Sequence, residues 1–299
     1  MLTADIQIRD PFVLPVAPYY YLYGTTDPNC WAGAGEGFNA FRSPDLENWE
    51  GPFPIFRASP TFWGTMHFWA PEVHAYAGRY YLFASFKAPQ RYRATQILVA
   101  DQPEGPFEPL IEGPSTPANW ECLDGTLYVD EQRRPWLVFC HEWVQVHNGA
   151  MYALPLSADL KQPAGRPVFL FSASEAPWVR PFAHPHWSVP PGGPLETFPC
   201  YVTDGPWLHR TAAGQLLMLW SSGGHAGYTL GVARSLSGLV TGPWEQQATP
   251  LYSQDGGHGM LFRTFEGQLR LVLHAPNATP LERARILPVE ETEAGLRLV

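Results

Sequence analysis

The chain has 299 residues, of which 45% are hydrophobic and 14% aromatic, so it can bury a large core in one large domain or two ordinary ones. Its net charge of −9 argues against a nucleic-acid partner, because phosphates demand a basic surface. No apolar run approaches the length of a membrane span, so we expect no membrane partner.

The N-terminus and the cysteines both bear on the cellular compartment. The opening segment MLTADIQIRD lacks the basic stretch followed by a long apolar one that marks a secretory signal. Cys30, Cys122, Cys140 and Cys200 show no CxxC spacing, so we expect reduced, mostly buried thiols rather than a zinc site or a disulfide framework. Both observations predict a cytoplasmic protein, and neither predicts its oligomeric state.

Glycine and proline interrupt the whole chain, with 27 and 32 residues respectively. Few windows keep a helical apolar period for three turns, whereas short β-branched and aromatic runs between turn residues dominate. The sequence therefore predicts an all-β fold.

Five segments have the pattern strand, tight turn, strand. They cover residues 10–25, 71–86, 124–140, 204–222 and 258–274. Further strands follow them in residues 38–56, 96–110, 150–171, 228–252 and 283–299. Five units of about four strands predict a five-bladed β-propeller, because radial repetition protects the sheet edges. Two β-sandwiches are the alternative, but no linker divides the chain, so we predict a single catalytic domain over residues 1–299.

A propeller brings equivalent residues of its blades to one mouth of the central channel. The residues that begin the inner strands form a first predicted ring: Asp10, Glu72, Asp124, Asp204 and His258. The residues that end the second strands form another: Thr25, Ser85, His141 with Glu142, Ser221 with Ser222, and His274. Asp-Gly and Asp-Pro steps also occur as ordinary turn residues. Carboxylates that share a pocket acquire separated pKa values, however, so we predict an active site at this mouth.

Five motifs together resemble those of glycoside hydrolase family 43. They are RDPFV at 9–13, FWAPEV at 68–73, LDGTLYVD at 123–130, TDGPWL at 203–208 and GGHGM at 256–260, and they extend over almost the whole chain. The resemblance implies a five-bladed propeller that hydrolyses arabinose- or xylose-containing glycans with inversion. A general base and a general acid then lie about 6.5–9.5 Å apart, with room for a water molecule between them.

The resemblance also implies roles for individual carboxylates. Asp10 matches the family's general base, and Asp124 matches the carboxylate that keeps the acid protonated through its own negative charge. The family's acid is usually a glutamate in an EGP step, and Asp204 occupies that place here, one methylene shorter. Three interpretations remain open: Asp204 is the acid, Glu142 supplies the proton from the same mouth, or hydrolysis is lost and binding kept. Glu72 is a further candidate for the acid and is also a candidate for substrate binding.

Other residues are candidates for binding. His258 matches the histidine of the family's central GHG, which in several members holds an ion or waters, so a channel-bound cation such as calcium near His258 is compatible with the resemblance, although no cofactor is required. Trp69 and Trp143 are candidates to stack on a sugar, although aromatic residues here are equally suited to packing between blades.

Residues 172–200 form the longest stretch without a strand pattern, and we expect them to be a lid or wall at the active mouth. The stretch 184–187, His-Pro-His-Trp, is compatible with a metal pair, but no third ligand is near it in the sequence.

We therefore expect an exo-acting α-L-arabinofuranosidase whose substrate is an oligosaccharide containing arabinose or xylose. The exo mode rests on residues 172–200 closing one end of a groove. A β-xylosidase, a β-galactofuranosidase and a non-catalytic glycan-binding propeller remain alternatives. So does a retaining fructan-cleaving propeller, whose carboxylates would lie about 5 Å apart.

Overall fold

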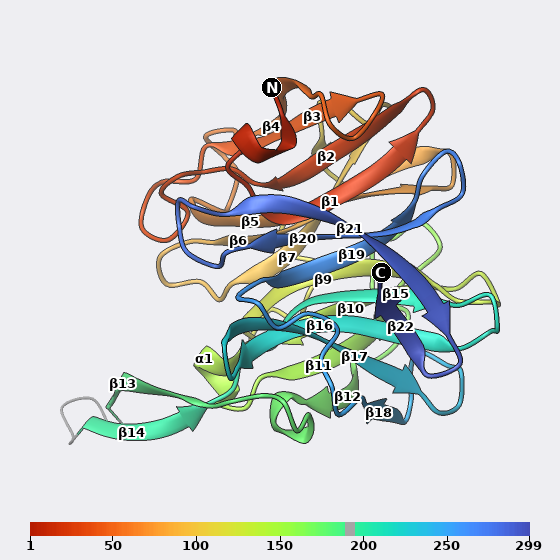
Figure 1. Ribbon diagram of the computed structural model, residues 1–299. Helices are drawn as coiled ribbons and strands as arrows, with labels where there is room; N and C mark the ends of the chain where they lie inside the picture. The colour runs from red at the N-terminus through yellow and green to blue at the C-terminus, as the bar shows by residue number, and fades with distance from the viewer. Residues whose placement is uncertain (189–194) are drawn as a thin grey trace.

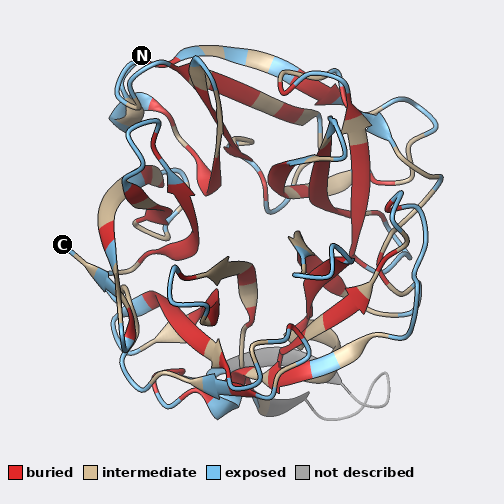
Figure 2. Cartoon of the chain, turned by 90° about the vertical axis from the view of Figure 1, so that its right-hand side faces the viewer, coloured by how far each residue is buried: buried red, intermediate tan, exposed pale blue. Residues whose placement is uncertain are grey.

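Five four-stranded antiparallel sheets surround a central axis, as the sequence predicts (Figures 1 and 2). The computed structural model describes the backbone of residues 1–188 and 195–299, and it describes side chains outside residues 183–197. Every blade is built from consecutive strands, with the first strand innermost. No helix in the described residues is long and apolar enough to cross a membrane.

The strands follow the blades in chain order. Blade 1 has β1 (Arg9–Val16), β2 (Tyr19–Thr25), β3 (Gly37–Ser43) and β4 (Glu50–Arg57). Blade 2 has β5 (Met66–Tyr76), β6 (Arg79–Lys87), β7 (Ala94–Ala100) and β8 (Glu108–Pro109). Blade 3 has β9 (Cys122–Val129), β10 (Pro135–His141), β11 (Ala150–Pro155) and β12 (Val168–Ser172). Blade 4 has β15 (Asp204–Arg210), β16 (Leu216–Gly224), β17 (Gly227–Ser235) and β18 (Trp244–Gln246). Blade 5 has β19 (Gly257–Arg263), β20 (Leu269–Ala275), β21 (Arg283–Thr292) and β22 (Gly295–Leu298).

The remaining elements are short. They are η1 (Thr3–Asp5), α1 (Trp143–Val146), η2 (Ala173–Glu175) and the separate hairpin of β13 (Phe182–Ser188) and β14 (Leu195–Cys200). The hairpin differs from the expected strand-free segment over residues 172–200. It projects from the body on the same side as α1 (Figure 1), so its described part does not fold across the ring.

The hydrophobic core lies between neighbouring blades. Blades 1 and 2 share one cluster with part of blade 5, and further clusters join blades 2 and 3, blades 3 and 4, and blades 4 and 5. Aromatic side chains such as Phe83, Phe139 and Trp220 are fully buried in these layers. Each sheet therefore packs on two neighbours. All four cysteines are buried and free, and Cys122 and Cys140 lie in the layers between blades.

Each inner strand carries the same irregularity near its start. Near its start, the inner strand has one residue more than the second strand that pairs with it, so the register shifts there; this is a β-bulge. The first residue of each bulge has a positive φ, between 48° and 54°. These residues are Asp10, Ala70, Asp124, Gly205 and His258. A proline or glycine follows each of them, so one local sequence device is repeated in all five blades.

The bulge residues connect each blade to the one before it. In four of the five blades, the backbone N–H of the bulge residue donates to a side chain at the end of the second strand of the preceding blade. The pairs are Ala70 to Thr25 (2.8 Å), Asp124 to Ser85 (2.9 Å), His258 to Ser221 (2.8 Å) and Asp10 to His274 (3.1 Å). In the remaining blade, Gly205 donates instead to Asp124 Oδ2, at 3.0 Å.

The strand pairing confirms Asp10, Asp124 and His258 in the first predicted ring and Thr25, Ser85, Ser221 and His274 in the second. It corrects the positions of the others. Glu72 lies two residues beyond the equivalent Ala70, because Pro71 occupies the bulge. Asp204 lies one residue before the equivalent Gly205. In the second ring Cys140, opposite Leu123, is the true equivalent of Ser85, so His141 and Glu142 follow the ring position.

The interblade bonds predict a stability effect. Ser85→Ala should leave the buried Asp124 N–H without an acceptor and lower the free energy of unfolding by about 1–3 kcal/mol. Urea unfolding measures this loss of free energy, and Ser59→Ala, at an exposed position, is the control. Equal stabilities of the two variants would show that these bonds do not secure the ring.

Candidate active site

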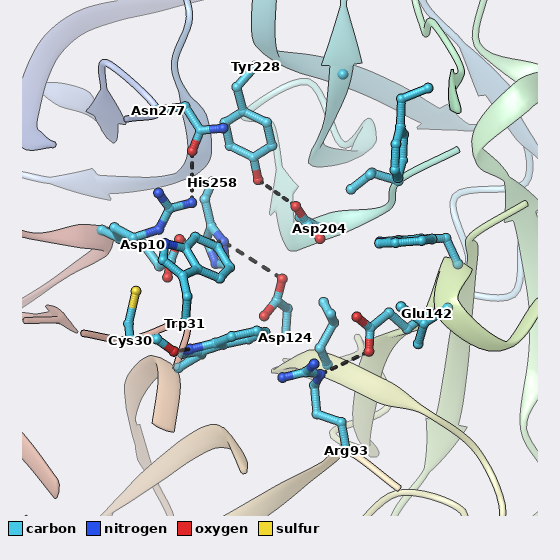
Figure 3. A pocket seen from close by; sticks show the side chains of 18 residues that line it. Asp10, Cys30, Trp31, Arg93, Asp124, Glu142, Asp204, Tyr228, His258 and Asn277 are labelled. Carbon is cyan, nitrogen blue, oxygen red and sulfur yellow. Dashed lines mark hydrogen bonds and ion pairs between the residues drawn. The ribbon is translucent and has the colours of Figure 1, made fainter. Parts of the chain in front are cut away.

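A pocket of about 550 Å³ opens where the bulge residues meet (Figure 3). It is lined by both charged and aromatic side chains. They include Arg9, Asp10, Trp31, Trp69, Arg93, Asp124, Glu142, Trp143, Phe182, Asp204, Tyr228, His258 and Asn277. The volume is in the range of small-molecule sites and exceeds that of one pentose.

Asp10 is held as an ionised carboxylate. Thr25 donates to its Oδ2 at 2.9 Å, and His258 Nδ1 lies 3.1 Å from its Oδ1. Burial favours the neutral form, but the charges of His258 and Arg9 outweigh it and hold the pKa of Asp10 well below its usual range. An ionised carboxylate in the pocket can accept a proton from water.

His258 is the positive charge at the centre of the site. Burial alone would lower its pKa, but Asp10 and Asp124 raise the pKa of His258 to about 10. Its Nδ1 is 3.8 Å from Asp124 Oδ2, so one imidazolium faces two carboxylates. The ring packs on Gly205, where a Cβ would lie 2.8 Å from it; this close approach and the positive φ explain the glycine of TDGPWL.

His274, by contrast, is neutral. Its Nδ1 accepts the Asp10 N–H, so the proton of the neutral ring lies on Nε2, which donates to Asn277 Oδ1 at 3.1 Å. Burial lowers the pKa of His274 to about 4, consistent with this assignment.

Asp124 and Asp204 both have raised pKa values, and the charge of Asp204 adds to the shift at Asp124. Burial raises the pKa of Asp124 to about 8, with a further contribution from the charge of Asp204. Burial also raises the pKa of Asp204 to about 6, against the opposing effects of His258 and of the hydrogen bond from Tyr228. Both carboxyl groups are thus harder to ionise than a free aspartate, because they are buried close to other acids. An ionised Asp124 beside a protonated Asp204 stays a prediction.

Glu142 lies in the pocket wall as one half of a buried ion pair. Arg93 Nε donates to its Oε2 at 2.9 Å, and Arg93 Nη1 donates to His67 Nδ1 at 2.9 Å. The guanidinium also lies 4.0 Å from the ring centre of Trp69, which stacks on His67 at 4.5 Å. Trp69 therefore lines the pocket while its ring packs on Arg93 and His67, and stacking of Trp69 on a sugar stays a prediction.

The pocket contains all but one of the predicted site residues. Asp10, Asp124, Asp204, Glu142, Trp69, Trp143 and His258 line it. Glu72 is not among the lining residues; it is buried deeper, with Oε2 3.0 Å from His74 Nε2. The stretch 184–187 falls outside the described side chains. Phe182, at the start of β13, does reach the pocket and packs edge-on against Trp143.

Four polar residues of the pocket were not predicted. Arg9 adjoins Asp10 in RDPFV, where its own role was overlooked, and it forms a 2.6 Å ion pair with Glu282. The other three residues come from outside the inner strands. Arg93 ends the loop before β7, Tyr228 lies in β17, and Asn277 lies in the loop after β20. They do not belong to the repeated pattern that marks the inner strands, so the repeat does not reveal them. The glycines just before Tyr228 do predict a turn at the mouth.

A channel-bound cation near His258 stays a prediction. His258 Nε2 is buried and has no hydrogen-bond partner. Calcium needs six to eight oxygen ligands, and the described residues contain no group of three or more His, Cys, Asp or Glu side chains placed to hold a metal, so such an ion would depend on other ligands.

A five-bladed propeller with a carboxylate pocket at one mouth defines a class of glycan-cleaving enzymes. The family model for glycosyl hydrolases family 43 matches residues 4–295. The chain belongs to this family, whose members are inverting glycoside hydrolases. The retaining fructan-cleaving alternative is thereby excluded.

Two solved structures and one curated protein illustrate the relationship. An endo-arabinase from Bacteroides thetaiotaomicron is 40% identical, with a TM-score of 0.87 over 98% of both chains. A thermostable family-43 glycoside hydrolase is 22% identical, with a TM-score of 0.79 over 98% of this chain and 92% of that one. An extracellular exo-α-(1→5)-L-arabinofuranosidase from Cellvibrio japonicus is 24% identical over 177 residues, which are 54% of this chain and 46% of that protein. The match therefore spans less than half of that curated relative.

The charge pair in the pocket predicts a pH-dependent stability difference. The pKa of His258 is about 10 in the folded protein and about 6.5 when unfolded, so its contribution is complete below pH 6.5 and lost as pH rises toward 10. Asp10→Asn removes the main charge that raises this pKa. The stability advantage of wild type over Asp10→Asn should therefore narrow between pH 6.5 and 10, by up to about 1.4 kcal/mol per pH unit.

Urea unfolding of both proteins at pH 6, 7.5 and 9 measures this difference. Parallel stability curves across the range would contradict a charged His258.

Proposed function

We propose that this chain hydrolyses arabinan with inversion and accepts sugar residues on both sides of the cleaved bond. The proposal is carried by one observation: the pocket places the ionised Asp10 with two carboxyl groups, Asp124 and Asp204, whose pKa values are raised. The 40% identical endo-arabinase supports the choice of arabinan over xylan or galactofuran.

In the proposed reaction Asp10 is the general base and Asp204 the general acid. Asp10 takes a proton from a water molecule whose oxygen bonds to the anomeric carbon. The bond from that carbon to the glycosidic oxygen breaks, and the glycosidic oxygen takes the proton from Asp204. Asp10 ends protonated and Asp204 ionised, so protons and charge balance.

Asp124 keeps the proton available to Asp204. Donation requires the proton to be on Asp204 and the charge on Asp124. Two contacts favour that arrangement: the Gly205 N–H donates to Asp124 Oδ2, and the His258 imidazolium lies 3.8 Å from the same oxygen.

The charges of the pocket suit a neutral sugar. Arg9 is paired with Glu282, Arg93 with Glu142, and His258 with Asp10. What remains is the single negative charge of the Asp124–Asp204 pair. That charge stabilises the positive oxocarbenium-like transition state and repels a uronic acid.

Sugar residues on both sides of the cleaved bond are supported by the aromatic lining of the pocket. Trp31 and Trp69 come from the sides of blades 1 and 2, whereas Trp143 and Phe182 come from the side of blade 3. The β13–β14 hairpin, which suggested an exo mode from sequence, projects from the body (Figure 1).

The identity of the acid is tested with two matched substitutions. Asp204→Asn should lower kcat on arabino-oligosaccharides by about a hundredfold to ten-thousandfold, because the leaving oxygen loses its proton donor. Glu142→Gln should raise KM more than it lowers kcat, since Glu142 is ion-paired with Arg93 and we assign it to substrate binding. Glu72→Gln, the same change outside the pocket, is the control. A larger kcat loss in Glu142→Gln than in Asp204→Asn would transfer the acid role to Glu142.

The mode of attack is tested on linear arabinan. Cleavage on both sides of the pocket predicts a rapid fall in viscosity relative to the release of reducing ends, with short oligosaccharides among the first products. If arabinose is the single product from the first minutes, the enzyme acts in the exo mode and the proposed mode is wrong. If xylan oligosaccharides are cleaved and arabinan is not, arabinan is excluded as the substrate.

A further inference from the structure

The orientation of Asp204 depends on one tyrosine. Asp10 is held by Thr25 and His258, and Asp124 by Gly205 N–H and His258. For the Asp204 carboxyl group, the hydrogen-bond partner found among the described residues is Tyr228, whose Oη donates to Oδ2 at 3.0 Å (Figure 3). The side chain of an aspartate does not fix its own carboxyl plane, because χ2 is broad and roughly two-fold.

The space that Tyr228 occupies is left by a neighbouring glycine. The residue just before the bulge is Arg9, Trp69, Leu123 or Asp204 in blades 1 to 4, and each lines the pocket. In blade 5 it is Gly257, where a Cβ would lie 2.6 Å from Cε1 of Tyr228. Blade 5 therefore has no side chain at this position, and the ring of Tyr228 from blade 4 occupies the space.

Tyr228 is itself held firmly. It is 8% exposed, and its ring stacks on neutral His274 with centroids 5.5 Å apart. Its backbone N–H donates to Asp255 Oδ1 at 3.1 Å. The hydroxyl is thus fixed relative to both Asp204 and the histidine that accepts the Asp10 N–H.

We propose that Tyr228 is a positioning residue that keeps Oδ2 of Asp204 as a hydrogen-bond acceptor, so that the proton donated to the leaving group is carried on Oδ1. A protonated carboxyl oxygen is a poor acceptor, so the Tyr228 hydrogen bond selects the oxygen that stays bare. This inference rests on the proposed role of Asp204 as the acid. It also explains how a side chain one methylene shorter than glutamate keeps a defined direction.

Tyr228→Phe tests the inference, since it removes the hydroxyl and keeps the ring on His274. The Tyr228 hydroxyl favours the ionised form of Asp204, so its removal should raise the titration midpoint of that carboxyl group. The measurement is a ¹³C carboxyl titration of aspartate-labelled protein, with Asp204 assigned by the signal lost in Asp204→Asn. This readout needs no substrate, and a merely structural tyrosine would not move it.

Kinetics provide the second readout. In Tyr228→Phe, kcat on an arabino-oligosaccharide should fall by about tenfold to a hundredfold. On para-nitrophenyl α-L-arabinofuranoside, whose leaving group needs little protonation, the loss should be much smaller. The alkaline limb of the oligosaccharide pH profile should move to higher pH in the variant.

Tyr23→Phe is the matched control, because Tyr23 is fully buried and its hydroxyl donates to the Pro103 carbonyl at 2.7 Å. It should lower the unfolding temperature without moving the Asp204 midpoint. An unchanged midpoint in Tyr228→Phe, or equal losses on the two substrates, would overturn the positioning role. Full activity in Asp204→Asn would instead overturn the proposed function, and that outcome does not depend on Tyr228.

Discussion

The hydrogen bond from a left-handed bulge residue to the preceding blade is the interaction on which the rest of the structure depends. It joins neighbouring sheets near the axis, and it turns the bulge side chain into the pocket. Asp10, Asp124 and His258 are all bulge residues. Aspartate and histidine tolerate a positive φ better than bulky residues do, so the residue types that suit the backbone also suit acid–base chemistry. The same bulges therefore join the blades and place the proposed catalytic groups.

The electrostatics of the site follow from how unevenly these acids are compensated. His258 lies closest to Asp10 and keeps it ionised, whereas Asp124 and Asp204 are buried with less compensation and have raised pKa values. The proposed base and the proposed acid are thus the same residue type, and their surroundings within one pocket separate their pKa values. Tyr228 adds direction to this difference, because it distinguishes the two oxygens of Asp204.

The fold could be predicted from the sequence because hairpins and turns are local, and the five repeats made the local pattern visible. Positions near the bulges are harder to predict from sequence, because the extra residue of a bulge shifts the two-residue alternation of a strand. The equivalent position therefore lies before Glu72 in blade 2 and after Asp204 in blade 4. The proton distribution between Asp124 and Asp204 depends on burial, which no motif contains. Arg93 and Tyr228 reach the pocket from outside the inner strands, so only the folded chain brings them to it.

Each blade is a continuous piece of chain, so no strand is shared between the first and last blades. The ring is closed there by packing and by polar contacts, including Arg9 to Glu282 and Asp10 to both His258 and His274. Two of the partners in this joint are the proposed base and its charged neighbour. A sugar that rearranges the bonds of Asp10 acts directly on the joint between the two ends of the chain. Occupancy of the pocket and opening of the ring are consequently linked equilibria, and substrate should protect the closed ring in proportion to its affinity.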